Sequence, residues 1–490
     1  MRICLLTGDG PHRRDAYGEW CRPLVDGLGS HTVDLVDVGW DPPATTPACP
    51  PRVASTRTVT LSRPILDHDA RRGHASRELT EAAEALCRGL IHGGSRFRDG
   101  LRHLALHAGP DGAALHGVPL ARMLAAAWRD GGPAESAPLP RLGGRDARAG
   151  ARLLRDTGRA LAAELPPTDL LHCAGGTTPL LAALAAHWRD GAPLLLTDGC
   201  ADPPGAPPAS LRQSPAMDTL LRLLRRAVGD AGYATADLVA STSDVHRAHA
   251  VDRGTPTHRA ITVPAGVDPA RWPALPEPAP EPPALVWAGN GGPGSGLGPV
   301  LDAFAGVVTV LPDAVLHLVG VTADDEDHCA ERVDRTGLGR AVRQYPLPLD
   351  PGERYAAGHV VVHVTGPADP AHGPVEAMMS GRAIAGFGSG AAGEVVGDAG
   401  VLVPPGDVAA LTDACIALLR SPDRRRALAD AARCRAMQRY TSDRMVRVYQ
   451  ALYTDLAGAP PAGRVEFELA LPAPRSAGAP TIRHLVPEGR

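Results

Sequence analysis

The strongest constraint on the fold is an alternation of short apolar runs with segments of helical periodicity, which occurs twice along the 490-residue chain. Apolar runs that end in turn residues are typical of buried strands, and intervening helices connect such strands in parallel. The two series are separated by PALPEPAPEPP at 273–283, whose six prolines favour a stiff linker. We therefore predict two doubly wound α/β domains with a ligand-binding cleft between the carboxyl ends of their sheets. The expected strands are 2–7, 32–37, 169–172, 193–197, 237–241 and 260–263 before the linker, and 284–288, 314–320, 359–364, 382–387 and 400–404 after it.

Helical periodicity dominates the remaining segments. Between about 75 and 165 the chain carries Ala, Leu and Arg at helical spacing, which predicts a helical insertion in the first domain. A helix is also expected near 17–28, between the first two strands. The end of the chain, 457–490, is rich in Pro and Ala and is expected to be loosely ordered, apart from one possible strand at 464–470. Three further helices are expected at 407–420, 423–436 and 441–456.

The composition excludes several functions. All 50 basic residues are Arg, so lysine chemistry such as a Schiff base or a P-loop lysine is absent. The formal charge of −4 and the scattered arginines predict no nucleic-acid partner. Nine cysteines without a C-x-x-C pair are typical of reduced thiols, and no apolar run reaches the length of about 18 residues that a transmembrane segment needs. We therefore expect a cytoplasmic protein with no transmembrane segment.

The most distinctive loop is VWAGNGGPGSGLGPVLDAF at 286–304, where glycines follow an expected strand and precede an expected helix. Gly289, Gly291 and Gly294 satisfy G-x-G-x-x-G, the dinucleotide fingerprint, which leaves a Rossmann dehydrogenase as a minor alternative. A plain strand-to-helix turn is a second interpretation. A third is a loop of another fold whose backbone N–H groups bind a phosphate.

A second stretch favours the third interpretation. Residues 373–407 read GPVEAMMSGRAIAGFGSGAAGEVVGDAGVLVPPGD. This stretch resembles the nucleotide-sugar half of retaining family-4 glycosyltransferases of the GT-B fold, whose string runs E-A-M-A-x-G, G-G, P-E-V-V and G-L-L-V-P-P-G-D. The residues that stand in register without a gap are Glu376, Ala377, Met378, Gly381, Arg382, Gly390, Glu394, Val396, Gly400, Pro404, Gly406 and Asp407.

The resemblance extends beyond this stretch and implies the domain limits. Residues 236–272 look like the end of the family's first domain, and 439–453 look like its closing segment; the amino-terminal part is faintly similar to the Pel exopolysaccharide type. The implied division is an amino-terminal, acceptor-side Rossmann-like domain at 1–272, the linker at 273–283, a nucleotide-sugar-binding Rossmann-like domain at 284–440, a helix at 441–456 that crosses back to the first domain, and the tail at 457–490.

The resemblance also implies the donor-binding residues. Glu376 takes the place of the glutamate that hydrogen-bonds the donor ribose, and Glu394 takes that of a glutamate beside the donor. No resident cofactor and no metal are expected, because the one D-x-D, Asp67-His68-Asp69, lies in a loop before the insertion and there is no H-E-x-x-H motif or clustered His/Cys ligand set. The implied donor-binding set is completed by Gly289, Asn290, Gly291, Ser295, Gly373 and Arg382.

Several positions depart from the family pattern. The family's other glutamate, eight residues before Glu376, is replaced by Ala368, with Asp369 one position away. Asn290 and Ser295 stand where the family has Arg and Lys on the diphosphate, and Asp15-Ala16 replaces a Gly-Gly pair. The catalytic residues are therefore unknown, with Asp369 and His172 as weak candidates. Arg13, Arg14 and Arg382 are candidate replacement cations.

The resulting hypothesis is a retaining transfer of a hexose from a nucleotide-diphosphate sugar to a glycan or small acceptor, with closure across 273–283. The alternative, favoured by the combined departures, is a catalytically weakened GT-B protein that binds a nucleotide sugar or serves a partner glycosyltransferase.

Overall fold

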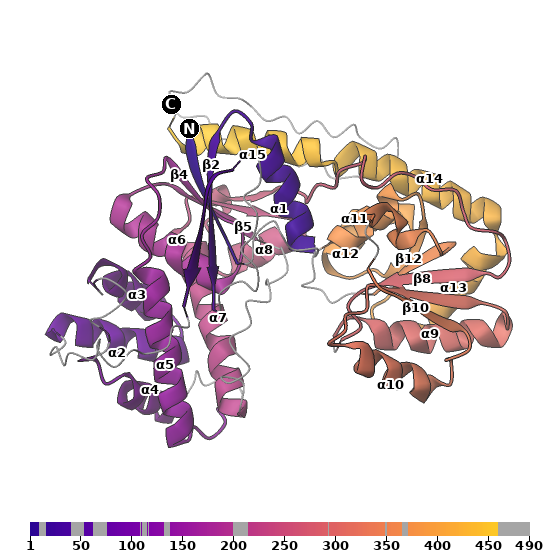
Figure 1. Ribbon diagram of the computed structural model, residues 1–490. Coiled ribbons are helices and arrows are strands. Elements are labelled where there is room, and N and C mark those ends of the chain that lie inside the picture. Colours follow the sequence, from indigo (N-terminus) through magenta and orange to yellow (C-terminus); the bar gives the residue numbers. More distant parts are fainter. Residues whose placement is uncertain are drawn as a thin grey trace.

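The computed structural model describes residues 1–8, 16–40, 53–61, 76–107, 109, 115, 117–131, 138–198, 214–292, 294–347, 350–364 and 371–458. These residues form two parallel sheets, one in each half of the chain, and the halves lie side by side in Figure 1. The first half contains β1 (Arg2–Thr7), α1 (Ala16–Gly27), β2 (Thr32–Gly39), β3 (Val53–Thr60), α2 (Arg77–His92), α3 (Ser95–His107), α4 (Leu120–Arg129), α5 (Gly144–Leu161), β4 (Leu170–Cys173), α6 (Thr177–Asp190), β5 (Leu194–Asp198), α7 (Pro215–Thr235), β6 (Leu238–Ser241), α8 (Asp244–Asp252) and β7 (Ala260–Thr262). The second half contains β8 (Ala284–Ala288), α9 (Leu297–Val310), β9 (Val315–Val319), α10 (Glu326–Thr336), β10 (Val342–Tyr345), β11 (Val360–His363), α11 (His372–Met379), β12 (Ala383–Phe387), α12 (Gly390–Val396), β13 (Val401–Val403), α13 (Val408–Arg420), α14 (Pro422–Arg439) and α15 (Ser442–Leu456).

The first sheet has the strand order β3-β2-β1-β4-β5-β6-β7, and every pair is parallel. Its interior strand β1 is buried at five of six positions, as expected for a strand covered by helices on both faces. The chain moves outward from β1 to β2 and β3 and then returns to β4 on the other side of β1. The carboxyl ends of β1 and β4 therefore mark a switch point of the kind where open α/β sheets bind ligands.

The second sheet repeats this plan with the order β10-β9-β8-β11-β12-β13, again parallel throughout. From β8 the chain adds β9 and β10 on one side and then returns to add β11 on the other side. The loops that follow β8 and β11 therefore flank the second switch point. The glycine-rich loop follows β8, and α11 with Glu376 lies beyond β11. The fold thus brings the two stretches singled out in the sequence to one edge of one sheet.

All eleven strands expected from the sequence are present within two residues of their expected limits. The sequence did not reveal β3 or β10, which lie at the outer edges of the two sheets. Edge strands keep one exposed side, so β3 (VASTRTVT) and β10 (VRQY) lack the apolar runs that identify central strands. The possible strand at 464–470 lies outside the described residues.

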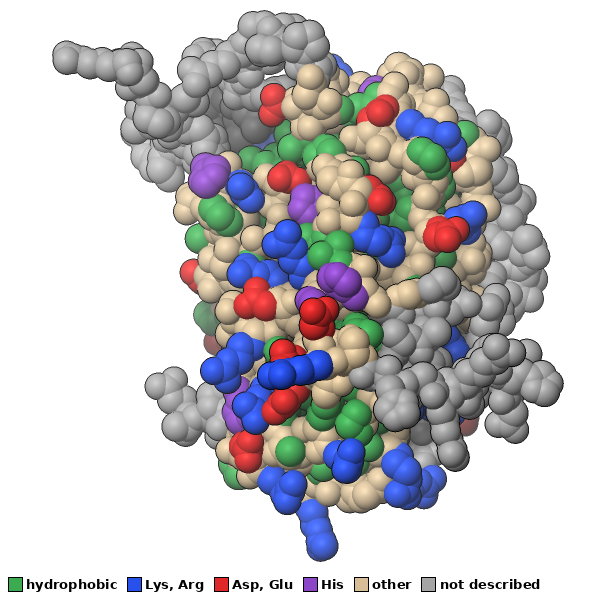
Figure 2. Space-filling view, turned by 90° about the vertical axis from the view of Figure 1, so that its left-hand side faces the viewer, with side chains coloured by type: hydrophobic (Ala, Val, Ile, Leu, Met, Phe, Trp, Pro, Cys, Tyr) green, Lys and Arg blue, Asp and Glu red, His purple; other side chains and the backbone are tan. Residues whose placement is uncertain are grey.

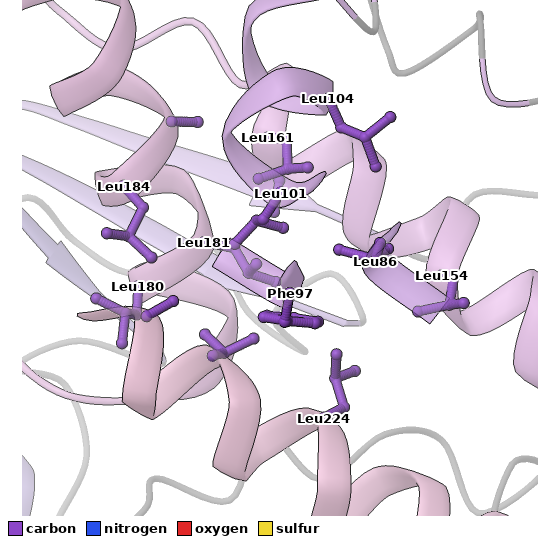
Figure 3. Close-up of a cluster of buried hydrophobic side chains, with 14 of the residues drawn as sticks. Leu86, Phe97, Leu101, Leu104, Leu154, Leu161, Leu180, Leu181, Leu184 and Leu224 are labelled. Carbon is purple, nitrogen blue, oxygen red and sulfur yellow. The ribbon is translucent and has the colours of Figure 1, made fainter. Parts of the chain in front are cut away.

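The helical insertion consists of α2, α3, α4 and α5, which share a core with α6 and α7 of the first domain. Figure 3 shows Leu101 of α3 beside Leu181 of α6, with Phe97 of α3 and Leu224 of α7 nearby. Gly100 permits the close approach of α2 and α3, because a Cβ there would lie 2.6 Å from the carbonyl oxygen of Ala82. The insertion is therefore part of the first hydrophobic core.

The surface of the first half carries charges of both signs. Figure 2, which faces this side of the molecule, shows Arg side chains interspersed with Asp and Glu. Within the described residues, no helix combines the length and apolar character needed to cross a membrane.

Helix α15 returns from the second half and packs on the first sheet, as Figure 1 shows. Its Tyr449 and Tyr453 are fully buried beside Trp20 of α1. Just before α15, the chain pairs with the segment that leads out of the first sheet: Val267 N–H donates to the Tyr440 carbonyl (2.8 Å), and Ser442 N–H donates to the Val267 carbonyl (2.9 Å). The two chain crossings between the halves are thus hydrogen-bonded to each other.

Candidate functional site

The glycine-rich loop after β8 packs directly against the end of β11. Gly296, at the amino end of α9, has φ +81°, and a Cβ there would collide with the Val364 carbonyl oxygen. The turn is closed by Ser295 N–H, which donates to the Gly292 carbonyl (3.1 Å). No side chain caps α9, so its first N–H groups are open to an anion at the switch point.

The predicted loop residues shape this turn. Gly289 N–H donates to the Val319 carbonyl (3.0 Å), and Gly291 has φ +85°, a conformation that glycine adopts readily. The exposed Asn290 accepts with its Oδ1 from the Gly292 N–H (3.3 Å). The Ser295 hydroxyl is buried and has no hydrogen-bond partner. These contacts keep the loop folded without the side-chain cations that the resemblance leads one to expect.

The electrostatic surroundings of the loop are acidic on one side. Asp325, just before α10, stands against Gly292: a Cβ at Gly292 would lie 2.5 Å from Asp325 Oδ1. The Asp325 carboxylate is held there by the Thr322 hydroxyl (2.8 Å). A basic group also approaches, because the guanidinium of Arg332 on α10 lies against Gly298 in the first turn of α9. Neither Asp325 nor Arg332 could be assigned to this loop from the sequence, since one precedes α10, the other lies on it, and this segment carries an ordinary mixture of charges.

Glu376 lies on α11 with its side chain 2% exposed. Its Oε2 pairs with Arg354 and accepts from the Tyr355 hydroxyl (3.3 Å), while His372 Nε2 lies 3.5 Å from Oε1. The Arg354 guanidinium also stacks over Trp272, 5.0 Å from the ring centre. The carboxylate that the resemblance assigns to a ribose is thus already compensated by a cation from the same domain. Burial and the neighbouring Glu376 carboxylate raise the pKa of Tyr355, so its hydroxyl stays a donor.

Gly373, in the first turn of α11, lies above the end of β11. The Tyr355 hydroxyl donates to the Gly373 carbonyl (3.3 Å), and a Cβ on Gly373 would lie 3.5 Å from the His363 ring. Burial lowers the pKa of His363 to about 4, so the imidazole is neutral near pH 7. His363 borders this candidate site and was missed from the sequence, because a histidine at the end of an apolar strand carries no distinctive motif.

Glu394 contacts the other half of the molecule. Its Oε2 accepts from the N–H groups of Asp244 (2.8 Å) and Val245 (3.4 Å) at the start of α8. Burial and the Asp244 carboxylate raise the pKa of Glu394. These residues border a pocket of about 720 Å³ between the halves, whose lining includes neither the glycine loop nor α11. Its remaining lining residues are Gly388, Gly390, Gly393, Leu402, Val403 and Pro404.

Arg382, a candidate replacement cation, has its guanidinium committed to the linker. The residue is 1% exposed, and its guanidinium donates to the carbonyls of Leu275 (2.7 Å) and Pro276 (2.9 Å) and, through Nε, to that of Tyr355 (3.2 Å). The guanidinium therefore lies on the linker side of the domain and not over the glycine loop. The expectation that Arg382 faces the donor does not agree with these contacts.

His172, a weak catalytic candidate, lies at the end of β4 and is fully buried. Its Nδ1 is 2.7 Å from the Tyr453 hydroxyl, and its Nε2 is 2.8 Å from the Thr197 hydroxyl, which in turn contacts Tyr449. Burial lowers the pKa of His172 to about 3. The neutral imidazole joins α15 to the first sheet, away from solvent.

The remaining candidates lie outside the described residues. These are Asp369, the substituted Ala368, Arg13, Arg14 and Asp15. Among the residues that the structure does describe, no three His, Cys, Asp or Glu side chains are grouped so that they could hold a metal ion.

Two doubly wound domains with a cleft between them define the GT-B fold. Residues 282–421 match the family model described as glycosyl transferases group 1, and residues 121–271 match the model for glycosyltransferase family 4. One match lies in each half of the chain. The fold and the two matches together support a GT-B glycosyltransferase.

Solved structures share this fold over most of the chain. The sucrose-phosphate synthase of Thermosynechococcus elongatus is 16% identical and aligns over 93% of this chain and 99% of its own, with a TM-score of 0.60. HepE of Anabaena, solved in complex with UDP and glucose, is 15% identical over 92% of this chain and 99% of its own, with a TM-score of 0.56. A glycosyltransferase of Rickettsia africae is 11% identical over 93% and 98%, with a TM-score of 0.53. At these identities the likeness concerns the fold. No curated protein matches the sequence.

Proposed function

We propose that this protein is a glycosyltransferase that transfers a hexose, with retention, from a nucleotide-diphosphate sugar to a glycan or small acceptor. The donor binds to the carboxy-terminal domain, 284–440, and the acceptor to the amino-terminal domain, 1–272. The reaction requires no resident cofactor or metal and takes place in the cytoplasm, where the buried cysteines remain reduced thiols.

The observation that carries this proposal is the geometry of the second switch point. A glycine loop, the uncapped start of α9 and the first turn of α11 meet there, within the segment that matches the group 1 glycosyltransferase model. The HepE structure contains UDP and glucose in a protein of the same fold, which supports a nucleotide sugar as donor.

The proposed transfer requires stabilisation of the departing diphosphate. A retaining transfer develops positive charge on the sugar and negative charge on the leaving group, which needs cations or a dense set of N–H donors. The loop from Gly289 to Gly296 and the first turn of α9 offer N–H groups and the positive end of a helix dipole. Arg332 is a basic group that lies against this turn.

A second candidate function is a nucleotide-sugar-binding or partner subunit of a glycosyltransferase system. It is favoured by Asn290 and Ser295 at the positions of the expected cations, by Asp325 beside the loop, and by the compensation of Glu376 through Arg354. Each of these features weakens the hold on a diphosphate or on a ribose.

Isothermal titration with a panel of UDP- and GDP-sugars, run beside a product assay, distinguishes the two candidates. Binding with release of the nucleoside diphosphate on addition of an acceptor supports the transferase. Binding without turnover supports the subunit. No binding of any nucleotide sugar would exclude a donor site of either kind.

A further inference from the structure

The contact between Glu394 and α8 completes the cap of a helix in the other half of the molecule. Ser243 is the N-cap of α8, and its hydroxyl accepts from the N–H of His246, the third residue of the helix (3.1 Å). The N–H groups of the first two residues, Asp244 and Val245, have no such partner within α8, and Glu394 accepts from both. A carboxylate at this place is also favoured by the helix dipole.

The start of α8 is fixed within the first half. The Asp244 carboxylate accepts from the Thr262 hydroxyl of β7 (2.6 Å) and from Arg247 Nε (3.2 Å). The side chain of Asp244 is held by its own half, and its N–H donates to Glu394. The start of α8 therefore presents fixed N–H donors to the carboxylate of Glu394 in the second half.

Glu394 is fixed just as firmly within the second half. Arg435 of α14 donates to the Glu394 carbonyl (3.0 Å) and to the Val395 carbonyl (2.7 Å). Helix α14 ends at Arg439, directly before the crossing in which Tyr440 and Ser442 pair with Val267. The Glu394 contact and this crossing are thus connected by one helix.

The proline-rich linker is held on the second half and does not form the pivot expected from the sequence. Arg382 binds its carbonyls at Leu275 and Pro276, and Arg425 forms a two-pronged ion pair with Glu277 (2.7 and 2.9 Å). A movement between the halves therefore pivots where Gly266 and Val267 meet Tyr440 and Thr441, because both crossings pass there.

From these contacts we infer that Glu394 is a positioning residue, an interdomain latch whose carboxylate caps α8 and holds the cleft closed. The inference rests on the proposed function, because closure brings the donor-side and acceptor-side domains together for transfer. When the halves separate about the crossing, the hydrogen bonds to Asp244 and Val245 break. The pocket bounded by Glu394 and Val245 then widens.

Small-angle X-ray scattering of the ligand-free full chain tests the latch without relying on catalysis. Glu394→Ala is expected to shift the population toward open molecules by about tenfold, the usual effect of losing a helix cap. Glu394→Gln keeps an accepting oxygen and is expected to remain mostly closed. Glu331→Ala, at an exposed glutamate of α10 that pairs with Arg335, serves as the matched control and is expected to scatter as the wild type does.

A second variant, which removes a cap made within α8 itself, distinguishes a latch between the halves from simple stabilisation of the helix. Ser243→Ala removes the intrahelical cap and is expected to lower thermal stability without opening the molecule. Where activity is measurable, Glu394→Ala is expected to lower kcat about tenfold with the donor KM changed less than twofold. Unchanged scattering of Glu394→Ala, or equal opening of Glu394→Ala and Ser243→Ala, would overturn the latch, and either result is read without any nucleotide sugar present.

Discussion

The linker side and the glycine-loop side of the carboxy-terminal domain use charge in opposite ways. On the linker side, Arg382, Arg425 and Arg433 direct their guanidinium groups at backbone carbonyls and at Glu277. At the glycine loop, Asn290 and Ser295 stand where cations are expected, and Asp325 lies against Gly292. The comparison teaches that the buried Arg382 and Arg425 fix the linker, whereas the proposed phosphate site offers backbone N–H groups and a helix end.

The largest expected effect is on the linker side. Arg425→Met removes the ion pair with Glu277 and the hydrogen bonds to the Leu418 and Leu419 carbonyls. Breaking a largely buried pair costs about 3–5 kcal/mol, so the free energy of unfolding in urea should fall by about that amount. Arg424→Ala, at the exposed neighbour, should change it by less than about 0.5 kcal/mol. A similar small change in both variants would show that the linker is not fixed by Arg425.

The next effect concerns Glu376, where the two sides of the domain meet. Glu376→Ala leaves the Arg354 guanidinium without its carboxylate and should cost about 2–3 kcal/mol of stability. It should also abolish the binding of UDP-sugars in titration calorimetry. Glu376→Gln retains an acceptor for Arg354 and should restore most of the stability but not the affinity. Full affinity in the folded Gln variant would mean that the carboxylate does not bind the donor.

A smaller effect is expected from returning a cation to the loop. Asn290→Arg places a guanidinium on an exposed position beside the uncapped start of α9 and should tighten UDP binding about tenfold, or about 1.4 kcal/mol. The gain should shrink as salt is added, because the new contact is ionic. Asn290→Gln is the matched control. Equal affinities of the Arg and Gln variants would place the phosphates elsewhere.

The smallest effect concerns Asp325. Asp325→Asn removes a negative charge next to Gly292 while it keeps an oxygen for the Thr322 hydroxyl, and should tighten UDP binding by a few-fold, about 0.5–1 kcal/mol. Asp324→Asn, at the exposed preceding residue, should leave the affinity unchanged. Weaker binding in the Asp325 variant would indicate that this carboxylate contacts the ligand favourably.

The sequence predicted the central strands and the two doubly wound domains because apolar runs and their spacing report burial directly, whereas the GT-B fold was implied by the family resemblance of residues 373–407. It did not reveal β3 and β10, which are edge strands with exposed side chains. The resemblance assigned Glu376 and the glycine loop to one donor-binding set. The residues that contact them in the structure, Arg354 and Asp325, were not predicted. Arg354 and Asp325 come from a 3-10 helix and from the turn before α10, and such contacts depend on packing across elements that no local pattern reports.

The contacts of Arg382 were also not predictable from the sequence. The sequence identifies Arg382 as a basic residue six positions after Glu376, whereas its burial and its four backbone contacts depend on the paths of the linker and of the segment at Tyr355 and Ala356. Glu394 likewise follows the Gly-Gly position of the resemblance, but its contact with α8 depends on how the two halves are placed together.

The central claim is that the carboxy-terminal domain holds a nucleotide-diphosphate sugar between the glycine loop and α11. Hydrogen–deuterium exchange of the full chain with and without UDP-glucose tests it most directly. Our account predicts slower exchange in peptides that cover 289–297 and 371–377, and no change in α2, which lies in the helical insertion. Unchanged exchange at 289–297, or slowing confined to the amino-terminal domain, would contradict it.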